Sequence, residues 1–253
     1  MIAGLKIAVV ALATAYLLPS YSILKRMANE RDDLGLNAIK VEGSATVSPS
    51  SAREVAALMG VEWQSGELSL VFTGAIRFPG RCRLELSSTE STKTLVALSS
   101  NGKKKGEGGD FPALQVAVDQ ICGLLALRAA GDGESRAAVE KHLTGLKVNY
   151  RNTSLARFRG TAAYVLGDTA EGAPQFWVFK DSASLSKPPF NPARVRFTDD
   201  KSIAWDVHFF DFASQATGQA FPRQVLVNKG TEPVLRFTAL KGDLKAKLDD
   251  SLF

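Results

Sequence analysis

The side chains that most often carry catalysis are sparse in this chain, which has only two histidines, His142 and His208. His208 lies two residues after Asp206, so on a strand both side chains point to one face and could form an acid–base pair. No nearby serine or cysteine lies in a nucleophile motif such as G-x-S-x-G. His142 belongs to a charged stretch and is expected to face solvent. The sequence therefore predicts a protein that is not an enzyme, with a hydrolase using His208 and Asp206 as the last alternative.

Metal-binding and phosphate-binding patterns are also missing from the sequence. No Cys or His pair has the spacing of zinc ligands, and the doublets Asp199-Asp200 and Asp249-Asp250 lack the glycine-containing loop of calcium sites. The stretch from Gly102 to Gly109 lacks P-loop spacing and is predicted to be a flexible hairpin loop. Its run Lys103 to Lys105 is interpreted as a solvated tip, with contact to anionic lipid head groups or an acidic partner as the alternative. We expect neither a metal nor a cofactor.

The N-terminus has the composition of a secretory signal peptide. Lys6 precedes an apolar run from Ile7 to Leu18, and Ser20 and Ser22 are small residues at the positions that a signal peptidase requires. The apolar run is well short of the ~20 residues that span a bilayer. We therefore predict a signal peptide over residues 1–22, cleaved near Ser22, one mature domain over residues 23–253, and a periplasmic location. An uncleaved inner-membrane anchor is the alternative.

Export would place the two cysteines, Cys82 and Cys122, in a compartment that permits disulfides. A bond between them would close a loop of roughly 40 residues and could contribute about 3–4 kcal/mol. Cys82 lies on a predicted strand and Cys122 on a predicted helix, so a disulfide and two buried thiols both remain open.

The elements that must position these residues are mainly strands with alternating apolar and polar side chains. The clearest strand runs from Leu68 to Phe78 and has one apolar and one polar face. Further strands are predicted at Cys82–Leu86, Ala163–Leu166, Gln175–Lys180, Val195–Phe197, Ile203–Phe209, Val225–Val227 and Leu235–Ala239. Helices are predicted at Ile23–Asp33, Leu114–Leu127 and Ser135–Leu146, and a loop at Ser186 to Pro192.

A sheet of this length must cover its apolar face, and three helices are too few to cover both faces. We therefore predict a mainly β fold with an α lid, in which a strongly curved antiparallel sheet, an incomplete barrel, surrounds helices; a β-sandwich is the competitor. Where lid and sheet do not fully interdigitate, an apolar cavity results. For any single residue packed core is the better interpretation, and the cavity is a prediction about the set of twelve residues at inward-type positions: Phe72, Ile76, Phe78, Leu84, Leu86, Phe176, Val178, Phe197, Trp205, Val207, Phe209 and Phe237.

Length and charge fit this single domain. At 253 residues the chain suits one large β-rich domain. The net charge of +5 does not point to nucleic acid, because the aromatic residues lie in strand-like segments and are not interleaved with basic residues on a binding face.

Several segments, in order along the chain, resemble those of LolA-like lipoprotein carriers and the wider LolA–LolB–RseB superfamily. They are Gly74 to Glu85, Leu95 to Lys103, Gln175 to Asp181, Phe221 to Val225 and, as a closing strand, Leu248 to Phe253. Two positions depart from the carrier pattern. Phe78 stands where an arginine usually precedes the proline, and Lys104 and Lys105 replace an aromatic residue.

The resemblance implies a monomer that holds lipoprotein acyl chains or phospholipid in the cavity without catalysis. It also implies an inner-membrane exporter and an outer-membrane acceptor as partners in outer-membrane biogenesis. Each buried methylene would contribute ~0.8 kcal/mol to binding. The alternative is an RseB-like module of the same fold that senses lipoproteins and regulates a membrane protein.

Overall fold

The computed structural model describes residues 17–100, 103–128, 133–180 and 190–253. Most of the predicted signal peptide, Gly102 and most of the predicted loop from Ser186 to Pro192 lie outside these residues. The helices are α2 (Ser20–Asp33), α3 (Pro49–Met59), α4 (Pro112–Leu125), α5 (Glu134–Gly145) and the short 3-10 helix η1 (Asp250–Leu252).

Twelve strands form one antiparallel sheet. They are β1 (Ala38–Val47), β2 (Leu68–Arg77), β3 (Arg81–Ser88), β4 (Ser91–Ser100), β5 (Lys103–Glu107), β6 (Thr153–Phe158), β7 (Thr161–Gly167), β8 (Gln175–Phe179), β9 (Pro192–Thr198), β10 (Ala204–Phe210), β11 (Gln224–Lys229) and β12 (Glu232–Asp243). Their order is β5-β4-β3-β2-β1-β12-β11-β10-β9-β8-β7-β6, so β5 and β6 are the edges of the described sheet.

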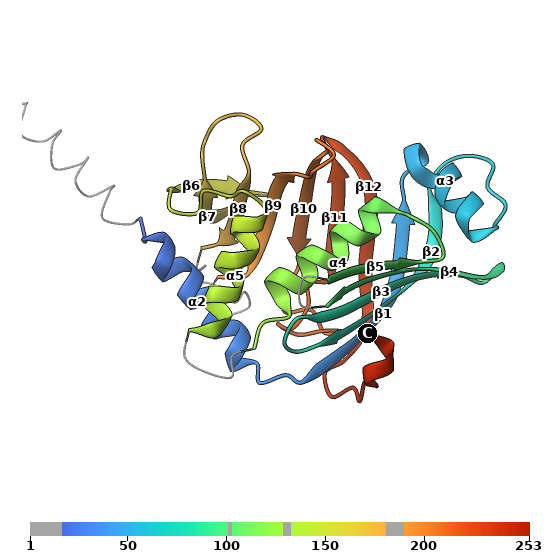
Figure 1. Ribbon diagram of the computed structural model, residues 1–253, viewed down its shortest axis with the longest axis horizontal. Helices are drawn as coiled ribbons and strands as arrows, with labels where there is room; N and C mark the ends of the chain where they lie inside the picture. Colours follow the sequence, from blue (N-terminus) through green and yellow to red (C-terminus); the bar gives the residue numbers. More distant parts are fainter. Residues whose placement is uncertain (1–16, 101–102, 129–132, 181–189) are drawn as a thin grey trace, which may run out of the picture.

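The sheet curves around the helices, as Figure 1 shows. Helix α4 lies along its inside, the pair α2 and α5 lies beside the β6–β9 half, and α3 lies at the opposite end near β2 and β4. This arrangement confirms the predicted curved antiparallel sheet with a helical cover and excludes the sandwich. The cause is the one-sided alternation of the strands: in β2, for example, Leu70 and Phe72 are buried and Val71 is exposed.

Most predicted elements form near their expected positions, and Pro112 begins α4 as anticipated. Three parts of the prediction were wrong. The residues Lys103–Glu107 form the edge strand β5, not a flexible loop, because their backbone pairs with β4. The terminal segment holds the 3-10 helix η1 in place of a closing strand. His142 is partly buried against α4 and does not simply face solvent, as described below.

Candidate functional site

The twelve candidate cavity residues lie together on the helix-covered face of the sheet. They come from β2, the turn after it, β3, β8, β9, β10 and β12, and each is less than 10% exposed. All belong to one continuous hydrophobic cluster that also includes buried residues of α2, α3, α4 and α5. Within it, the rings of Phe72 and Phe237 lie 4.5 Å apart, centroid to centroid. The alternation of the strands thus places the predicted residues on one surface, which an apolar chain would have to reach from the helical side.

Helix α4 is the part of the cover that is fixed most firmly. It is apolar around most of its circumference and packs against β3, β4 and β11. Cys122 of α4 and Cys82 of β3 form a disulfide, with their Cα atoms 5.6 Å apart. This bond joins the middle of the cover to the sheet.

A buried arginine holds α2 against the end of α4. Arg31 is 2% exposed. Its guanidinium donates to the carbonyl oxygen of Leu125 from Nη2 at 3.0 Å, to Gln219 at 2.9 Å and to Ala220 at 2.6 Å. Burial lowers the pKa of Arg31 to about 10, so the group remains charged at neutral pH. The carbonyl oxygens at the C-terminal end of α4 carry the negative end of the helix dipole and suit a cation.

Sequence reasoning missed Arg31, because its partners lie 94 to 189 residues away. The only local signal is an arginine in the last turn of a helix whose neighbours Met27 and Ala28 are apolar and buried.

Helices α2 and α5 form a pair with polar contacts of its own. Ser135 donates to Asp32 Oδ1 at 2.6 Å, and the guanidinium of Arg136 lies 4.6 Å from the ring centroid of Tyr21. His142 of α5 lies against α4, where its Nε2 is 2.9 Å from Gln120 Oε1. A Cβ atom at Gly123 would overlap this ring, so glycine is what permits the close approach of α4 and α5.

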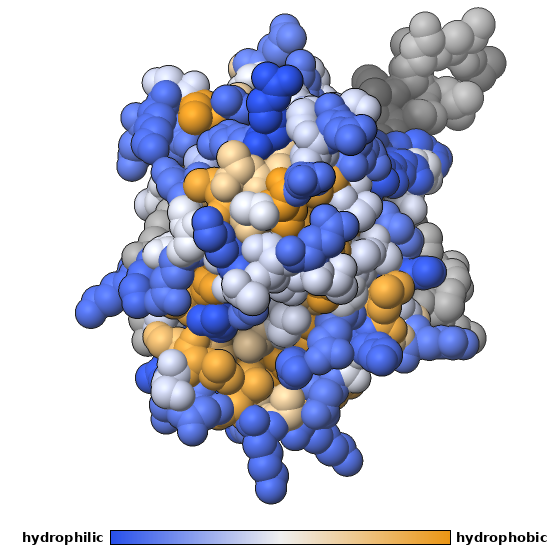
Figure 2. Space-filling view, turned by 90° about the vertical axis from the view of Figure 1, so that its right-hand side faces the viewer, coloured by the Kyte–Doolittle hydropathy of each residue, from blue (hydrophilic) through white to orange (hydrophobic). Residues whose placement is uncertain are grey.

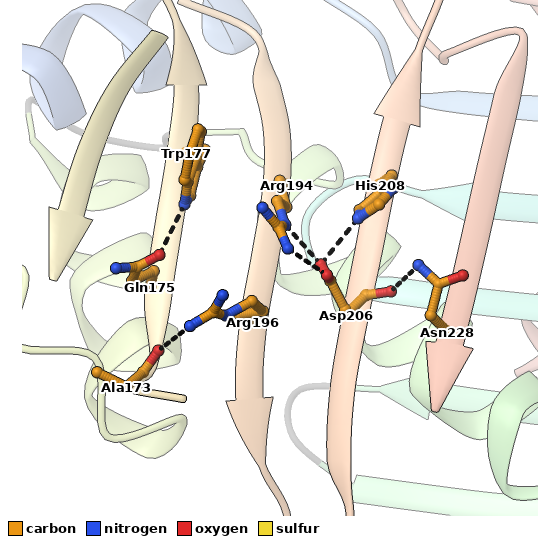
Figure 3. Close-up of polar contacts among 8 residues, drawn as sticks. All are labelled: Ala173, Gln175, Trp177, Arg194, Arg196, Asp206, His208 and Asn228. Carbon is orange, nitrogen blue, oxygen red and sulfur yellow. Dashed lines mark hydrogen bonds and ion pairs between the residues drawn. The ribbon is translucent and has the colours of Figure 1, made fainter. Parts of the chain in front are cut away.

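The outer face of the sheet holds the predicted His208–Asp206 pair, drawn in Figure 3. His208 Nε2 lies 2.9 Å from Asp206 Oδ1, and the same oxygen accepts from Arg194 Nε at 2.8 Å. The backbone carbonyl of Asp206 accepts from Asn228. These groups lie beside a small second cluster of Phe158, Ala163, Ala193 and Phe210.

Asp206 is the shared carboxylate of this network and pairs with both Arg194 and His208. Burial raises the pKa of Asp206, but hydrogen bonds from Arg194 and His208 outweigh that effect and hold it below its ordinary value. The network also faces away from the twelve apolar residues, since Val207 and Phe209 alternate with His208 along β10.

Within the described ranges, no group of three or more His, Cys, Asp or Glu side chains is placed to hold a metal ion. In the same part of the chain, no helix is both long and apolar enough to cross a membrane.

No family model and no curated protein matches the chain. Among solved structures, it is similar to a LolA superfamily protein from Nitrosomonas europaea, with 12% identity, TM-score 0.47 and coverage of 93% of this chain and 97% of the other. A putative outer membrane lipoprotein-sorting protein domain from Vibrio parahaemolyticus matches with 14% identity, TM-score 0.42 and coverage of 90% and 94%. A DUF1329 family protein from Desulfovibrio piger matches with 10% identity, TM-score 0.47 and coverage of 92% and 97%. At these values the likeness assigns neither a ligand nor a partner to this chain.

Proposed function

We propose that this protein is a periplasmic carrier or binder of lipids or lipoproteins that holds acyl chains against the concave face of its sheet without catalysis. The observation that supports it is the continuous apolar surface formed by the twelve residues named above, on a curved sheet covered by helices that pack over it. Removing an acyl chain from water onto such a surface provides affinity without chemistry, at ~0.8 kcal/mol for each methylene buried.

Access to that surface requires part of the cover to move, because all twelve residues are buried. Helix α4 is tied to β3 by the disulfide, whereas α2 is held through Arg31 and its contacts with α5. The proposal therefore makes the α2–α5 pair the moving part of the cover and α4 the fixed part. Delivery would involve an inner-membrane exporter and an outer-membrane acceptor.

The proposed location rests on the leader, with a signal peptide over residues 1–22 and a mature domain over residues 23–253. The described part of α2 is compatible with cleavage near Ser22. The helix begins at Ser20, but its first buried residues are Ile23 and Leu24, so cleavage after Ser22 would remove Tyr21 and its contact with Arg136 and leave the buried part of α2 intact.

A second candidate function is an RseB-like interaction module of the cell envelope. The dense burial of the apolar face favours it, because a core that is already filled has no need of a ligand. The protein would then function by binding a partner through its surface. Figure 2 shows that the side of the molecule where α3, β2 and β4 lie carries apolar patches among charged side chains, which a protein partner could cover.

Native mass spectrometry of the exported protein, purified without detergent, tests the proposal. We expect a mass excess that solvent extraction identifies as phospholipid or an acylated peptide. The variant Phe72→Asp should abolish loading, whereas Val71→Asp should not, because the adjacent Val71 side chain is 43% exposed. Phe72→Ala serves where the aspartate variant fails to fold. A wild-type protein that carries no lipid and takes up no fluorescent fatty acid would overturn the carrier proposal and favour the interaction module.

A further inference from the structure

The turn between β2 and β3 carries a surface pocket of which the proposed function uses only Phe78. Its volume is about 280 Å³, and it is lined by Arg77, Phe78, Pro79, Arg81 and Asp250. The first four residues are almost continuous in sequence. Asp250 belongs to η1, whose segment crosses back to this turn from β12 at the end of the chain.

Two guanidinium groups face one carboxylate oxygen in this pocket. Arg77 and Arg81 are directly opposite each other in the β2–β3 register, so their positive charges lie side by side. Both donate from Nη1 to Oδ1 of Asp250, from Arg81 at 2.7 Å. The neighbouring carboxylate of Asp249 instead accepts from the backbone N–H of Ser251 at 2.8 Å. A single side-chain oxygen therefore joins the paired arginines.

Another anionic group could displace the carboxylate of Asp250 from the two arginines. Its side chain is 67% exposed, and those of Arg77 and Arg81 are 37% and 40% exposed. Ion pairs at such exposure are weak. Each guanidinium has five N–H donors in a planar fork that fits carboxylate or phosphate. Only one donor from each arginine is used on Asp250, so a group with more oxygen atoms could form more hydrogen bonds.

The apolar wall of the pocket connects it to the interior. Phe78 is 9% exposed and belongs to the main hydrophobic cluster, next in sequence to Arg77. The adjacent Gly80 donates to the carbonyl of Ala126, just beyond the end of α4, at 2.9 Å. Nearby, Arg128 donates to the side-chain oxygen of Asn37, whose carbonyl accepts from Phe78 N–H. Arg77 and Arg81 alternate with the buried Ile76 and Cys82 and so lie on the outer face of the sheet, whereas Phe78 in the turn joins the apolar core. The pocket thus lies at the end of the sheet, where an anionic amphiphile could place its phosphate outside and reach the core around the turn.

We infer that Arg77 and Arg81 form a binding site for a phosphate group, and that Asp250 occupies this site as a tethered carboxylate until phosphate displaces it. The inference deepens the proposed function and rests on it in one respect: the phosphate would belong to the head group of an anionic lipid whose chains meet the apolar face. Free phosphate is the other source of the same chemistry.

Uptake of two fluorescent lipids with identical acyl chains tests the site: phosphatidylglycerol, which carries a phosphate, and diacylglycerol, which does not. The wild-type protein should bind labelled phosphatidylglycerol more tightly than labelled diacylglycerol. Arg77→Gln/Arg81→Gln should remove this preference, and Asp250→Asn should raise affinity for phosphatidylglycerol by about two- to fivefold, as expected for loss of an exposed ion pair. Arg83→Gln is the matched control, because Arg83 is on the same face of β3 and pairs with Glu85. Circular dichroism checks that each variant is folded.

Calorimetry with inorganic phosphate supplies the second arm. Phosphate binding that Arg77→Gln/Arg81→Gln abolishes, without any difference between the two lipids, would assign the site to free phosphate. Equal uptake of both lipids, unchanged in every variant and without phosphate binding, would overturn the site but leave the carrier proposal standing. Failure to take up either lipid would instead refute the carrier proposal, and the phosphate titration would then decide the site alone.

Discussion

At the scale of single residues, Asp206 shows how polar groups are placed on this fold. It is 8% exposed, and its carboxylate is held between Arg194 and His208 on the outer face of the sheet. The sequence correctly placed both residues of the His208–Asp206 pair on one face, because side chains two residues apart on a strand point to the same side. It did not reveal Arg194, which comes from the neighbouring strand β9 and gives the carboxylate its role as an ion-pair partner.

We predict that Asp206→Asn removes part of the acid sensitivity of the fold. The folded-state pKa of Asp206 is below its ordinary value, so its ionisation stabilises the fold above the unfolded pKa of about 3.9. That contribution is lost as pH falls through the lower folded pKa. The variant should lose about 2–3 kcal/mol at pH 7 and less at pH 3, measured by urea unfolding. Asp200→Asn, an exposed turn residue, is the control. Equal losses at both pH values would contradict the prediction.

At the scale of elements, sequence pattern predicted most of those with a clear alternating or helical apolar face and missed β5, which has none, together with β1 and α3, whose apolar faces are interrupted or built from small side chains. Strand β5 has no apolar residue and forms only because β4 offers it a backbone partner. Strand β1 is interrupted by a bulge at Gly43, where a Cβ atom would lie 1.9 Å from the Thr238 carbonyl oxygen. Helix α3 had usable signals, Pro49 at its start and Gly60 just after its end, but two of its four buried side chains are alanines, so its apolar face is a weak pattern.

The disulfide between β3 and α4 yields a prediction for these two elements. Joining Cys82 to Cys122 closes a loop of 40 residues, so its removal should cost roughly 4 kcal/mol through the entropy of the unfolded chain. The Cys82→Ser/Cys122→Ser variant should therefore unfold at lower urea concentration than the oxidised wild type. Dithiothreitol should lower the wild-type midpoint and leave the variant unchanged. A wild-type midpoint that does not respond to reductant, with reduction verified by thiol titration, would contradict the prediction.

At the scale of the whole molecule, the sequence could predict which face of the sheet is apolar and that helices cover it. It could not predict the bonds that hold the helices in place, because these bonds join residues that are distant in the chain. Arg31 reaches carbonyl groups 94 to 189 residues away, and Ser135 meets Asp32 across 103 residues. These bonds differ in strength. Helix α4 is held by a disulfide, whereas α2 and α5 are held by hydrogen bonds.

This difference predicts the order in which the cover opens. Local unfolding begins where few covalent or buried contacts resist it, so backbone amides of α2 and α5 should exchange hydrogen faster than those of α4. Arg31→Met leaves several carbonyl groups without their charged donor. It should lower the free energy of local opening by about 1–3 kcal/mol and so speed exchange in α2 by about fivefold to 150-fold. Arg26→Met on the exposed side of α2 should not. Hydrogen exchange read by mass spectrometry distinguishes these outcomes. Exchange that begins in α4 while the disulfide is intact would show that the cover opens at its middle, and the α2–α5 pair would then not be the route to the apolar face.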